Sequence, residues 1–542
     1  MEELKKKYRE FLKKGEWALV KSADEFFGCH YIGSPLNLLT GFSGSAGEAI
    51  INYDGKIVLF VDSRYHEQVD IECSRDDIEI VKLKQGEGAI DKIIEKVGKS
   101  VLYISNSALM ATYNKLAQEK VNVGFYADFC DFGENKQIDK AKKIFTVDKK
   151  ICRKSFLDKL GELKELIKHR YWLVTSLEEI AYLTNLRSFQ MPECSTFKAK
   201  LLVDFVDKSI LYCDEEIENL PEGIIKKGLS EFSEDIRKIR EFVAVNPDII
   251  TIGDVSDTLL PYPLKEKYCA NMASIKDEGE LAHYKQAFSA LDCALYAFKN
   301  QIRAGLSEFD LKEIFERELI KYGAKCTSFK TILAIEDNSS IIHYSKSDKN
   351  KILKDGDLIL LDCGGYYEGG YATDITRVFV CGEGEVSPFK KEIYTAVLKA
   401  FLAAYYSNSS TGAQMDETVR EILDPYVSRG FLFPHGLGHG IGIAVHQAPP
   451  VVSSLTKKEY KLLPNMTHSI EPGLYGEFEG EKFGIRLENV VFVKPDNKRE
   501  SFSKFEFEEK LIDYKMLNEE EKDRLKAWQK KAEEFYARNC RK

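Results

Sequence analysis

Acidic side chains stand inside apolar stretches in the last third of this 542-residue chain. The four clearest cases, with their contexts, are Asp362 (LILLDCGG), Asp374 (YATDITRVFV), Glu471 (SIEPGLY) and Glu488 (GIRLENVVFV). A carboxylate in an apolar setting is costly to bury unless it is paired or bound to a cation. Four carboxylates in one pocket would also repel each other unless cations compensate their charge. The pattern therefore predicts a fold in which distant segments meet around a pair of divalent metal ions.

A Gly-rich segment, FPHGLGHGIGIAVHQAPP, adds three of the chain's nine histidines within twelve residues. Its glycines disfavour a stable helix and allow the backbone to approach a bound ligand. Oxygen ligands with one imidazole and no thiolate favour manganese, with zinc, cobalt or iron as alternatives. The predicted metal ligands are Asp362, Asp374, His439, Glu471 and Glu488.

Each motif alone also has a simpler interpretation. LILLDCGGYYEGGYATDITRVFV predicts two strands joined by a turn, in which Asp362 could cap the turn and Asp374 could pair with Arg377. The Gly-rich segment could be an anion-binding or purely structural loop. Arg486 and Glu488 are two residues apart, so in a strand they share a face. They could form an ordinary salt bridge, or Arg486 could orient Glu488 or bind a substrate carbonyl.

The length predicts two or three domains, because a single core of 542 residues is improbable. Alternating apolar runs and amphipathic stretches predict an α/β domain over 1–150 and a second over 151–272. A long amphipathic helix opens a third unit over 273–502, which contains every motif above. We therefore expect catalysis there, followed by an extension over 503–542.

The extension ends in a charged stretch whose apolar residues recur at helical spacing. These residues are Leu525, Trp528, Ala532 and Phe535. We expect this helix to pack against the third domain or a partner subunit.

Composition excludes several other classes. A net charge of -9 gives no basic footprint for nucleic acid. The charged start, MEELKKKYREFLKKGEW, does not resemble a secretory signal, and no stretch approaches a membrane span. Twelve cysteines are scattered singly with no CxxC pair, which favours reduced thiols over a disulfide framework. We expect a cytoplasmic enzyme without nucleic-acid or membrane partners.

The motifs DCGG, ATDITR, HGLGHGIG, VHQAP, SIEPG and GIRLEN, in this order, resemble the pita-bread metallopeptidases, specifically the aminopeptidase P (Xaa-Pro aminopeptidase) family. YIGSPLNLLTGFSGSAGEAIINYDGKIVLFVDSRYHEQ resembles the opening domain of its three-domain members, and EKLIDYKMLNEEEKDRLKAWQKK resembles their C-terminal extension. The middle domain is the least specific part of the likeness. The resemblance implies two creatinase-like N-terminal α/β domains followed by a pita-bread (α+β) catalytic domain.

The resemblance also implies an activity, the removal of the N-terminal residue from peptides with proline at position two. Matched motif by motif, Asp362 binds one metal, Asp374 and Glu488 bridge both, His439 completes one ion and Glu471 the other. The metals, usually manganese, activate a water that attacks the scissile carbonyl, and Glu471 is the general base.

Four further residues match family positions that face the substrate. His343 in IIHYS and His446 in AVHQA match positions that contact the peptide backbone and stabilise the tetrahedral intermediate. His435 matches a position in the proline pocket, and Arg486 one near it. The family also implies a homodimer.

Two departures from the family pattern bear on the site. Asp362 and Asp374 are twelve positions apart, where the family usually has eleven. We predict that the extra residue is absorbed in the EGG turn by a three-residue loop with a left-handed glycine, which keeps both strands facing as before. A slipped register would instead turn Asp374 away from the metals. Gln447 replaces a common glutamate, with a modest expected effect on the ligands' surroundings.

Three other activities compete with this interpretation. A prolidase, which cleaves Xaa-Pro dipeptides, has the same five ligand types in the same order. A non-catalytic peptide- or histone-binding module with the pita-bread fold would lack the ligands. A methionine aminopeptidase would lack the two preceding domains.

Overall fold

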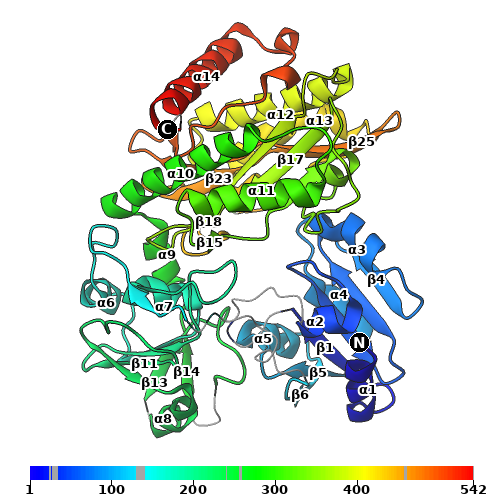
Figure 1. Ribbon diagram of the computed structural model, residues 1–542. Helices are drawn as coiled ribbons and strands as arrows, with labels where there is room; N and C mark the ends of the chain where they lie inside the picture. The colour runs from blue at the N-terminus through cyan, green and yellow to red at the C-terminus, as the bar shows by residue number, and fades with distance from the viewer. Residues whose placement is uncertain are drawn as a thin grey trace. The chain divides into compact units, whose positions relative to one another are not determined.

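The computed structural model divides the chain into two compact units, an N-terminal and a C-terminal one (Figure 1). The N-terminal unit comprises Met1–Thr146, Lys154–Leu186 and Thr196–Cys269, and the C-terminal unit comprises Val147–Arg153, Arg187–Ser195 and Ala270–Lys542. The residues that the structure describes are 1–22, 26, 34–129, 139, 141–239, 241–255, 259–456 and 460–540. The first three residues of the YIGSPLNLL motif, Tyr31, Ile32 and Gly33, lie outside this set.

The N-terminal unit contains a six-stranded mixed sheet in the order β4-β3-β2-β1-β5-β6. Its strands are β1 (Trp17–Lys21), β2 (Glu48–Asn52), β3 (Ile57–Val61), β4 (Ile78–Lys82), β5 (Val101–Ser105) and β6 (Asn122–Tyr126). Its helices are α1 (Glu2–Phe11), α2 (Pro35–Thr40), α3 (His66–Cys73), α4 (Ala89–Val97) and α5 (Met110–Gln118). Alternate residues of β3 enter different cores, Leu59 one and Phe60 the other, so the sheet is covered on both faces.

A second six-stranded sheet in this unit, β12-β11-β10-β8-β13-β14, repeats the pairing pattern of the first. Its strands are β8 (Tyr171–Val174), β10 (Lys200–Asp204), β11 (Ser209–Tyr212), β12 (Ile224–Lys227), β13 (Phe242–Val245) and β14 (Leu260–Pro263), with helices α6 (Phe156–Lys164), α7 (Leu177–Thr184) and α8 (Phe232–Lys238). In both sheets two antiparallel pairings lead from the first strand, and the remaining three are parallel. The chain therefore contains the same topology twice, although its sequence shows no internal repeat.

The C-terminal unit combines helices with small antiparallel sheets. Its three-stranded sheets are β16-β17-β19, β20-β24-β25 and β23-β26-β27, and the two-stranded sheets β15-β18 and β21-β22 lie in the same unit. The helices are α9 (Tyr268–Ser274, which begins in the other unit), α10 (Glu278–Lys299), α11 (Glu308–Lys321), α12 (Pro388–Tyr406), α13 (Gly412–Val427) and α14 (Glu519–Asn539). The strands are β15 (Cys326–Thr327), β16 (Ile332–Ile335), β17 (Leu358–Cys363), β18 (Gly365–Tyr366), β19 (Ile375–Val380), β20 (Phe431–Leu432), β21 (Gly438–His439), β22 (Val451–Val452), β23 (Thr467–Ile470), β24 (Gly473–Phe478), β25 (Glu481–Arg486), β26 (Asn489–Val493) and β27 (Arg499–Ser501).

Helices cover the strands that carry the acidic motifs. Phe379 of β19 contacts Phe298 of α10 edge-on, and Phe298 contacts Phe315 of α11. The neighbouring residues Val378 and Val380 enter a large core shared with α12, α13 and α14. Strands buried on both sides explain the near-continuous apolar sequences around Asp362 and Asp374.

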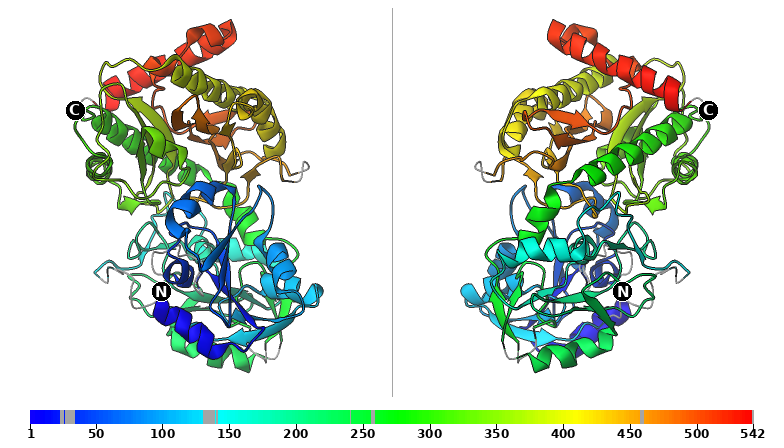
Figure 2. Two further views of the ribbon diagram at one scale, coloured as in Figure 1. Left: turned by 90° about the vertical axis from the view of Figure 1, so that its right-hand side faces the viewer. Right: turned by 90° about the vertical axis from the view of Figure 1, so that its left-hand side faces the viewer.

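The C-terminal helix α14 lies beside α10 and α12 (Figures 1 and 2, red). Its Leu525, Trp528 and Ala532 are buried as predicted, while Phe535 is half-buried. Trp528 Nε1 also donates to the Phe505 carbonyl at 3.0 Å. The prediction that this helix packs on the third domain is confirmed.

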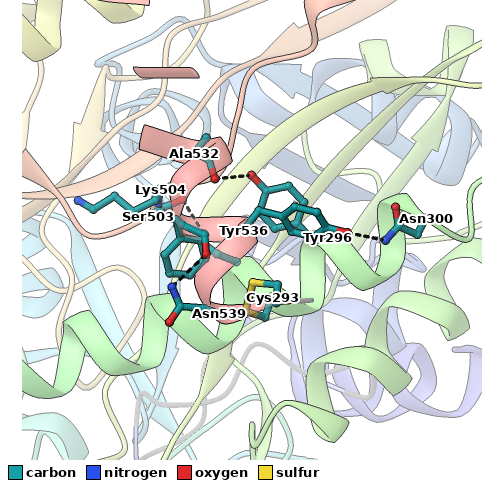
Figure 3. The surroundings of a disulfide bond; sticks show 11 residues. Cys293, Tyr296, Asn300, Ser503, Lys504, Ala532, Tyr536 and Asn539 are labelled. Atoms are coloured by element: carbon teal, nitrogen blue, oxygen red, sulfur yellow. Dashed lines mark hydrogen bonds between the residues drawn. A yellow bond between two sulfur atoms is a disulfide. The ribbon is translucent and has the colours of Figure 1, made fainter. Parts of the chain in front are cut away.

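The sequence favours reduced thiols over a disulfide framework, but the structure contains one disulfide. Cys293 of α10 and Cys540, just after α14, form a disulfide with their Cα atoms 5.1 Å apart (Figure 3). Around it, the rings of Tyr296 and Tyr536 have centroids 4.4 Å apart. The partners are 247 residues apart, so no local spacing reveals the pair. Packing of the two helices creates it. Eight other described cysteines are not in a disulfide.

Among the described residues, no helix combines the length and the apolar character that crossing a bilayer requires.

Candidate metal centre

The hairpin of β17 and β19 places the two aspartates on one face. Asp362 pairs in register with Thr376, and Asp374 lies two residues before Thr376, directly ahead of β19. Residues two apart in an extended segment point the same way, so Asp362, Thr376 and Asp374 share a face. The register has not slipped.

The turn that joins the strands differs in length from the prediction. Tyr366 and Ala372 form a bridge, so the loop covers residues 367–371, not the three predicted. The expected left-handed glycine is Gly370, with φ of 66°. His283 of α10 accepts a hydrogen bond from the Gly369 N–H at 3.3 Å. Burial lowers the pKa of His283 to about 4, which keeps its ring neutral and able to accept. A longer turn, supported from α10, therefore absorbs the extra residue.

His439 stands in the short strand β21, and its tautomer is fixed by the backbone. Its Nδ1 lies 3.1 Å from the Gly440 carbonyl and donates to it, so Nε2 is the ring nitrogen that carries the lone pair a metal would bind. That Nε2 atom lies 3.6 Å from Asp374 Oδ2 and 3.3 Å from Glu471 Oε1.

Ser469 connects His439 to Glu471. Its hydroxyl accepts from the His439 N–H at 2.9 Å and donates to Glu471 Oε1 at 3.2 Å. Strands β21 and β23 approach closely because position 438 is glycine, where a Cβ would lie 2.2 Å from the Ser469 carbonyl oxygen. This glycine of the Gly-rich segment is thus required for the two strands to approach.

Glu488 is not inside a strand as predicted. It lies in the link between β25 and β26, where the chain passes from one sheet to another. Thr376 Oγ1 donates to Glu488 Oε2 at 2.7 Å, and the Glu488 N–H donates to the Thr376 carbonyl at 3.1 Å. Thr376 therefore holds Glu488 on the face of the two aspartates.

Three buried carboxylate oxygens at this point have no hydrogen-bond partner among the described residues. They are Asp362 Oδ1, Asp374 Oδ1 and Glu488 Oε1. One ligand atom each from Asp374, His439 and Glu488 lies within 4.8 Å of the others. Burial, and then repulsion from neighbouring carboxylates, raises the pKa of both Asp374 and Glu488 well above the usual range. A divalent cation would satisfy these oxygens and offset the repulsion, so the residues fit the predicted metal centre.

Arg486 has a partner that the sequence did not suggest. It is 2% exposed and donates to Asp362 Oδ2 at 2.6 Å, so its ion pair is with Asp362 rather than Glu488. Its Nε donates to Thr376 Oγ1 at 3.0 Å, and the same hydroxyl binds Glu488. Arg486 therefore orients Glu488 only indirectly.

A hydrogen-bonded chain continues from Arg486 to His435. Arg486 donates to the Tyr475 hydroxyl at 2.8 Å, and that oxygen lies 2.9 Å from His435 Nε2. His435 Nδ1 lies 2.8 Å from the Gly436 carbonyl and donates to it, so Nε2 accepts from Tyr475. Burial raises the pKa of Tyr475 to about 12, which keeps this hydroxyl protonated. His435 Nδ1 is also 3.9 Å from Glu471 Oε2.

The remaining predicted histidines lie on two loops. The His446 ring lies 4.2 Å, centroid to centroid, from the ring of His439. His343 directly follows Ile342, whose carbonyl accepts from Arg486 at 3.5 Å. Gln447 supports the backbone: its Oε1 accepts from the N–H groups of Ile443 at 2.7 Å and Ala444 at 3.2 Å.

The alternative pairing of Arg377 with Asp374 is replaced by other partners. Arg377 is buried and donates to the carbonyls of Glu488 at 2.7 Å and Phe505 at 3.1 Å. Its guanidinium thus joins the segment that carries Glu488 to the segment under α14.

Sequence reasoning missed three residues at the centre, Thr376, Ser469 and Tyr475. Thr376 had a usable signal, since it is two residues after Asp374 in a strand and must share its face. Tyr475 had none, because its contacts with Arg486 and His435 arise from the pairing of β24 with β25.

Comparison with protein families agrees with this geometry. Residues 282–495 match metallopeptidase family M24, and residues 27–135 and 135–287 match two models of the creatinase/prolidase N-terminal domain. Residues 282–495 therefore form a domain of metallopeptidase family M24. As expected, the fold of the chain is two creatinase-like α/β domains followed by a pita-bread catalytic domain.

Two curated relatives align with most of this chain. A probable Xaa-Pro aminopeptidase P of Laccaria bicolor is 29% identical, covering 89% of this chain and 82% of its own. Xaa-Pro aminopeptidase 1 of Dictyostelium discoideum is 28% identical, covering 89% and 84%. Both relatives therefore match across all three expected domains.

Two solved structures have a similar fold. One is X-prolyl aminopeptidase of Caenorhabditis elegans, described as a cytosolic enzyme with a di-nuclear active site. It superposes with a TM-score of 0.83 and is 19% identical, and the match covers 97% of this chain and 93% of that chain. Prolidase of Pyrococcus horikoshii gives 0.54 at 23% identity, covering 66% of this chain and 99% of its own.

Proposed function

We propose that this chain is an aminopeptidase that releases the N-terminal residue from peptides with proline at the second position, using two divalent metal ions. The observation that carries the proposal is the set of buried, unsatisfied oxygens of Asp362, Asp374 and Glu488 beside His439. Two further facts support it: residues 282–495 match metallopeptidase family M24, and relatives that align with 89% of the chain are named Xaa-Pro aminopeptidases.

Five side chains would hold the metals, which we propose to be manganese. Asp362, Asp374, His439, Glu471 and Glu488 would hold the two ions between them. Bound ions of this kind lower the pKa of coordinated water and polarise carbonyl groups. The oxygen-rich donor set with a single imidazole suits manganese better than a thiol-seeking metal.

Glu471 is the proposed general base. Its Oε1 receives a hydrogen bond from Ser469, which orients the carboxylate that would take the proton. The Arg486–Tyr475–His435 chain ends 3.9 Å from Glu471 Oε2. The hydrogen bond from Ser469 would hold the carboxylate in one orientation as it takes a proton.

Substrate recognition is assigned to four residues. His343 and His446 would contact the peptide backbone and donate to the oxyanion that develops at the scissile carbonyl. His435 would line the proline pocket, with Arg486 near it. The position of His446 against His439 supports a role close to the metals.

The chain's wider organisation is also part of the proposal. We assign domains to 1–150, 151–272 and 273–502, with an extension over 503–542. The two sheets of the N-terminal unit, within 17–126 and 171–263, agree with the first two assignments. We further propose a cytoplasmic location and a homodimer.

The deciding experiment uses metal-stripped protein and two short peptides. We expect no hydrolysis of either substrate without metal. Added Mn²⁺ should restore cleavage of an Xaa-Pro-Xaa tripeptide, with much slower cleavage of the matching Xaa-Pro dipeptide. A preference for the dipeptide would make the enzyme a prolidase. Protein that binds Mn²⁺ but cleaves neither peptide would contradict the proposed activity, and zinc, cobalt and iron added in turn would test the choice of metal.

A further inference from the structure

The segment 335–348, which carries His343, is anchored to a buried carboxylate on a neighbouring helix. Glu308, the first residue of α11, is 0% exposed. Its Oε1 accepts hydrogen bonds from the Ile335 N–H at 2.7 Å and Asn338 Nδ2 at 2.9 Å. Its Oε2 accepts from the Tyr344 hydroxyl at 2.6 Å and the Asp348 N–H at 2.9 Å.

These four hydrogen bonds fix both ends and the middle of the segment. Ile335 ends β16, and the short helix Glu336–Ser340 follows it. Each oxygen of Glu308 accepts two hydrogen bonds, which satisfies a charge that would otherwise be costly to bury. Its place in the first turn of α11 adds a favourable interaction with the helix dipole. This carboxylate therefore organises the segment.

Both neighbours of His343 are held by named partners. The Ile342 carbonyl accepts from Arg486, which also binds the proposed metal ligand Asp362. The Tyr344 hydroxyl donates to Glu308, and Asn338 Nδ2 contacts the same hydroxyl at 3.0 Å. Burial, together with the hydrogen bond to Glu308, raises the pKa of Tyr344, so its hydroxyl stays protonated. The backbone of His343 is thus restrained from both sides.

The far side of the segment is also restrained. Gly484 lies in β25, two residues before Arg486, and its N–H donates to Ser339 Oγ at 2.8 Å. A Cβ at position 484 would lie 2.1 Å from the Ser339 carbonyl oxygen, so only glycine permits this approach. The segment is therefore fixed against the strand that supplies Arg486 and against helix α11.

We propose that Glu308 is a positioning residue that sets the placement of His343 for the reaction. The inference rests on the proposed function, in which His343 contacts the substrate backbone. Glu308 acts through the segment rather than on substrate. Its loss should therefore resemble a partial loss of His343.

Glutamine at position 308 separates this role from simple space filling. Glu308→Gln keeps the shape, and its carbonyl oxygen can still accept two hydrogen bonds. The amide NH₂ cannot accept, so one pair of donors, either Ile335 with Asn338 or Tyr344 with Asp348, loses its acceptor. Tyr344→Phe removes one hydroxyl and keeps the buried ring. Glu313→Gln, at an exposed glutamate on the same helix, is the matched control.

We expect Glu308→Gln to lower kcat for an Xaa-Pro-Xaa peptide by about 10- to 100-fold, because misplacement of a catalytic group by about 1 Å costs this much. In Glu308→Gln, KM and manganese content should change little. Tyr344→Phe should also lower kcat, and Glu313→Gln should leave kcat unchanged. The sharper test repeats Glu308→Gln in a His343→Ala background. If Glu308 acts through His343, the second substitution should cost nothing further. An equal loss in both backgrounds would overturn the proposal.

A second measurement does not depend on peptidase activity. In protein with ¹⁵N-labelled histidine, the His343 ring signal is identified by its absence in His343→Ala. We expect this signal to shift or broaden in Glu308→Gln and Tyr344→Phe but not in Glu313→Gln. An unmoved His343 signal would overturn the positioning role. An inactive wild-type enzyme with the expected signal changes would contradict only the proposed function.

Discussion

Thr376 offers a direct test of how the protein holds its metal ligands. The Thr376 hydroxyl donates to Glu488 at 2.7 Å and accepts from Arg486 at 3.0 Å, so it joins a ligand to the cation that pairs with Asp362. Thr376→Val has nearly the same shape and removes both interactions. Hydrogen bonds to charged groups contribute about 1.5–3 kcal/mol each. At about 1.4 kcal/mol per tenfold change in a binding constant, loss of the bond to Glu488 should weaken Mn²⁺ binding by about 10- to 100-fold.

The assay is calorimetric titration of metal-free protein with Mn²⁺, with metal content measured after gel filtration. Thr376→Ser retains the hydroxyl and should bind Mn²⁺ nearly as tightly as the wild type. A melting temperature for Thr376→Val close to that of metal-free wild-type protein would show that the fold is intact. Wild-type affinity in a folded Thr376→Val protein would refute the idea that this hydroxyl orients Glu488.

Four further predictions follow from the site and the disulfide. Glu471→Gln should abolish turnover while metal largely stays bound; full activity would remove Glu471 from the general-base role. Asp374→Asn should lower metal occupancy, and unchanged metal content would mean that its carboxylate is not a ligand. Burial and neighbouring acids raise the pKa of Asp374 and Glu488, so the metal-free folded state binds protons that the unfolded state releases. The stability of metal-free protein should therefore fall as pH rises above the ordinary carboxyl range. Chemical denaturation of metal-free protein at pH 5.5 and 7.5 would show this loss, and the loss should shrink in Asp374→Asn; an equal pH dependence in both proteins would contradict it. Cys540→Ser should lower the melting temperature, since closing a loop with partners 247 residues apart can contribute up to about 5 kcal/mol, and an unchanged value would mean that the link to Cys293 adds no stability.

Local chemistry made much of the hairpin predictable. Asp362 stands in β17 and Asp374 directly ahead of β19, in apolar segments whose pattern predicts strands. The two-residue period of a strand then determines which side chains share their face. The left-handed glycine at 370 was expected because turns between strands require such a residue. The loop length was not predictable, because His283 supports the turn from a helix that begins about 90 residues earlier in the chain.

The partners of charged residues were harder to predict. Arg486 is two residues from Glu488, yet it pairs with Asp362, which lies 124 positions away. Sequence proximity suggested the wrong partner because Glu488 leaves the strand at the link between β25 and β26. The disulfide and the hydrogen-bonded chain through Tyr475 have the same origin. Each depends on helix or strand packing that no short pattern encodes.

The contacts of Arg377 give the C-terminal extension a role beyond covering a core. The Arg377 guanidinium donates to the main-chain carbonyls of Phe505 and Glu506, and Trp528 of α14 also donates to the Phe505 carbonyl. A protein cut back to residue 502 would leave a positive charge in a dry interior without two of its acceptors, next to the backbone that presents Glu488. Removal of the apparent tail should therefore be felt first at the metal ligands, well away from the cut.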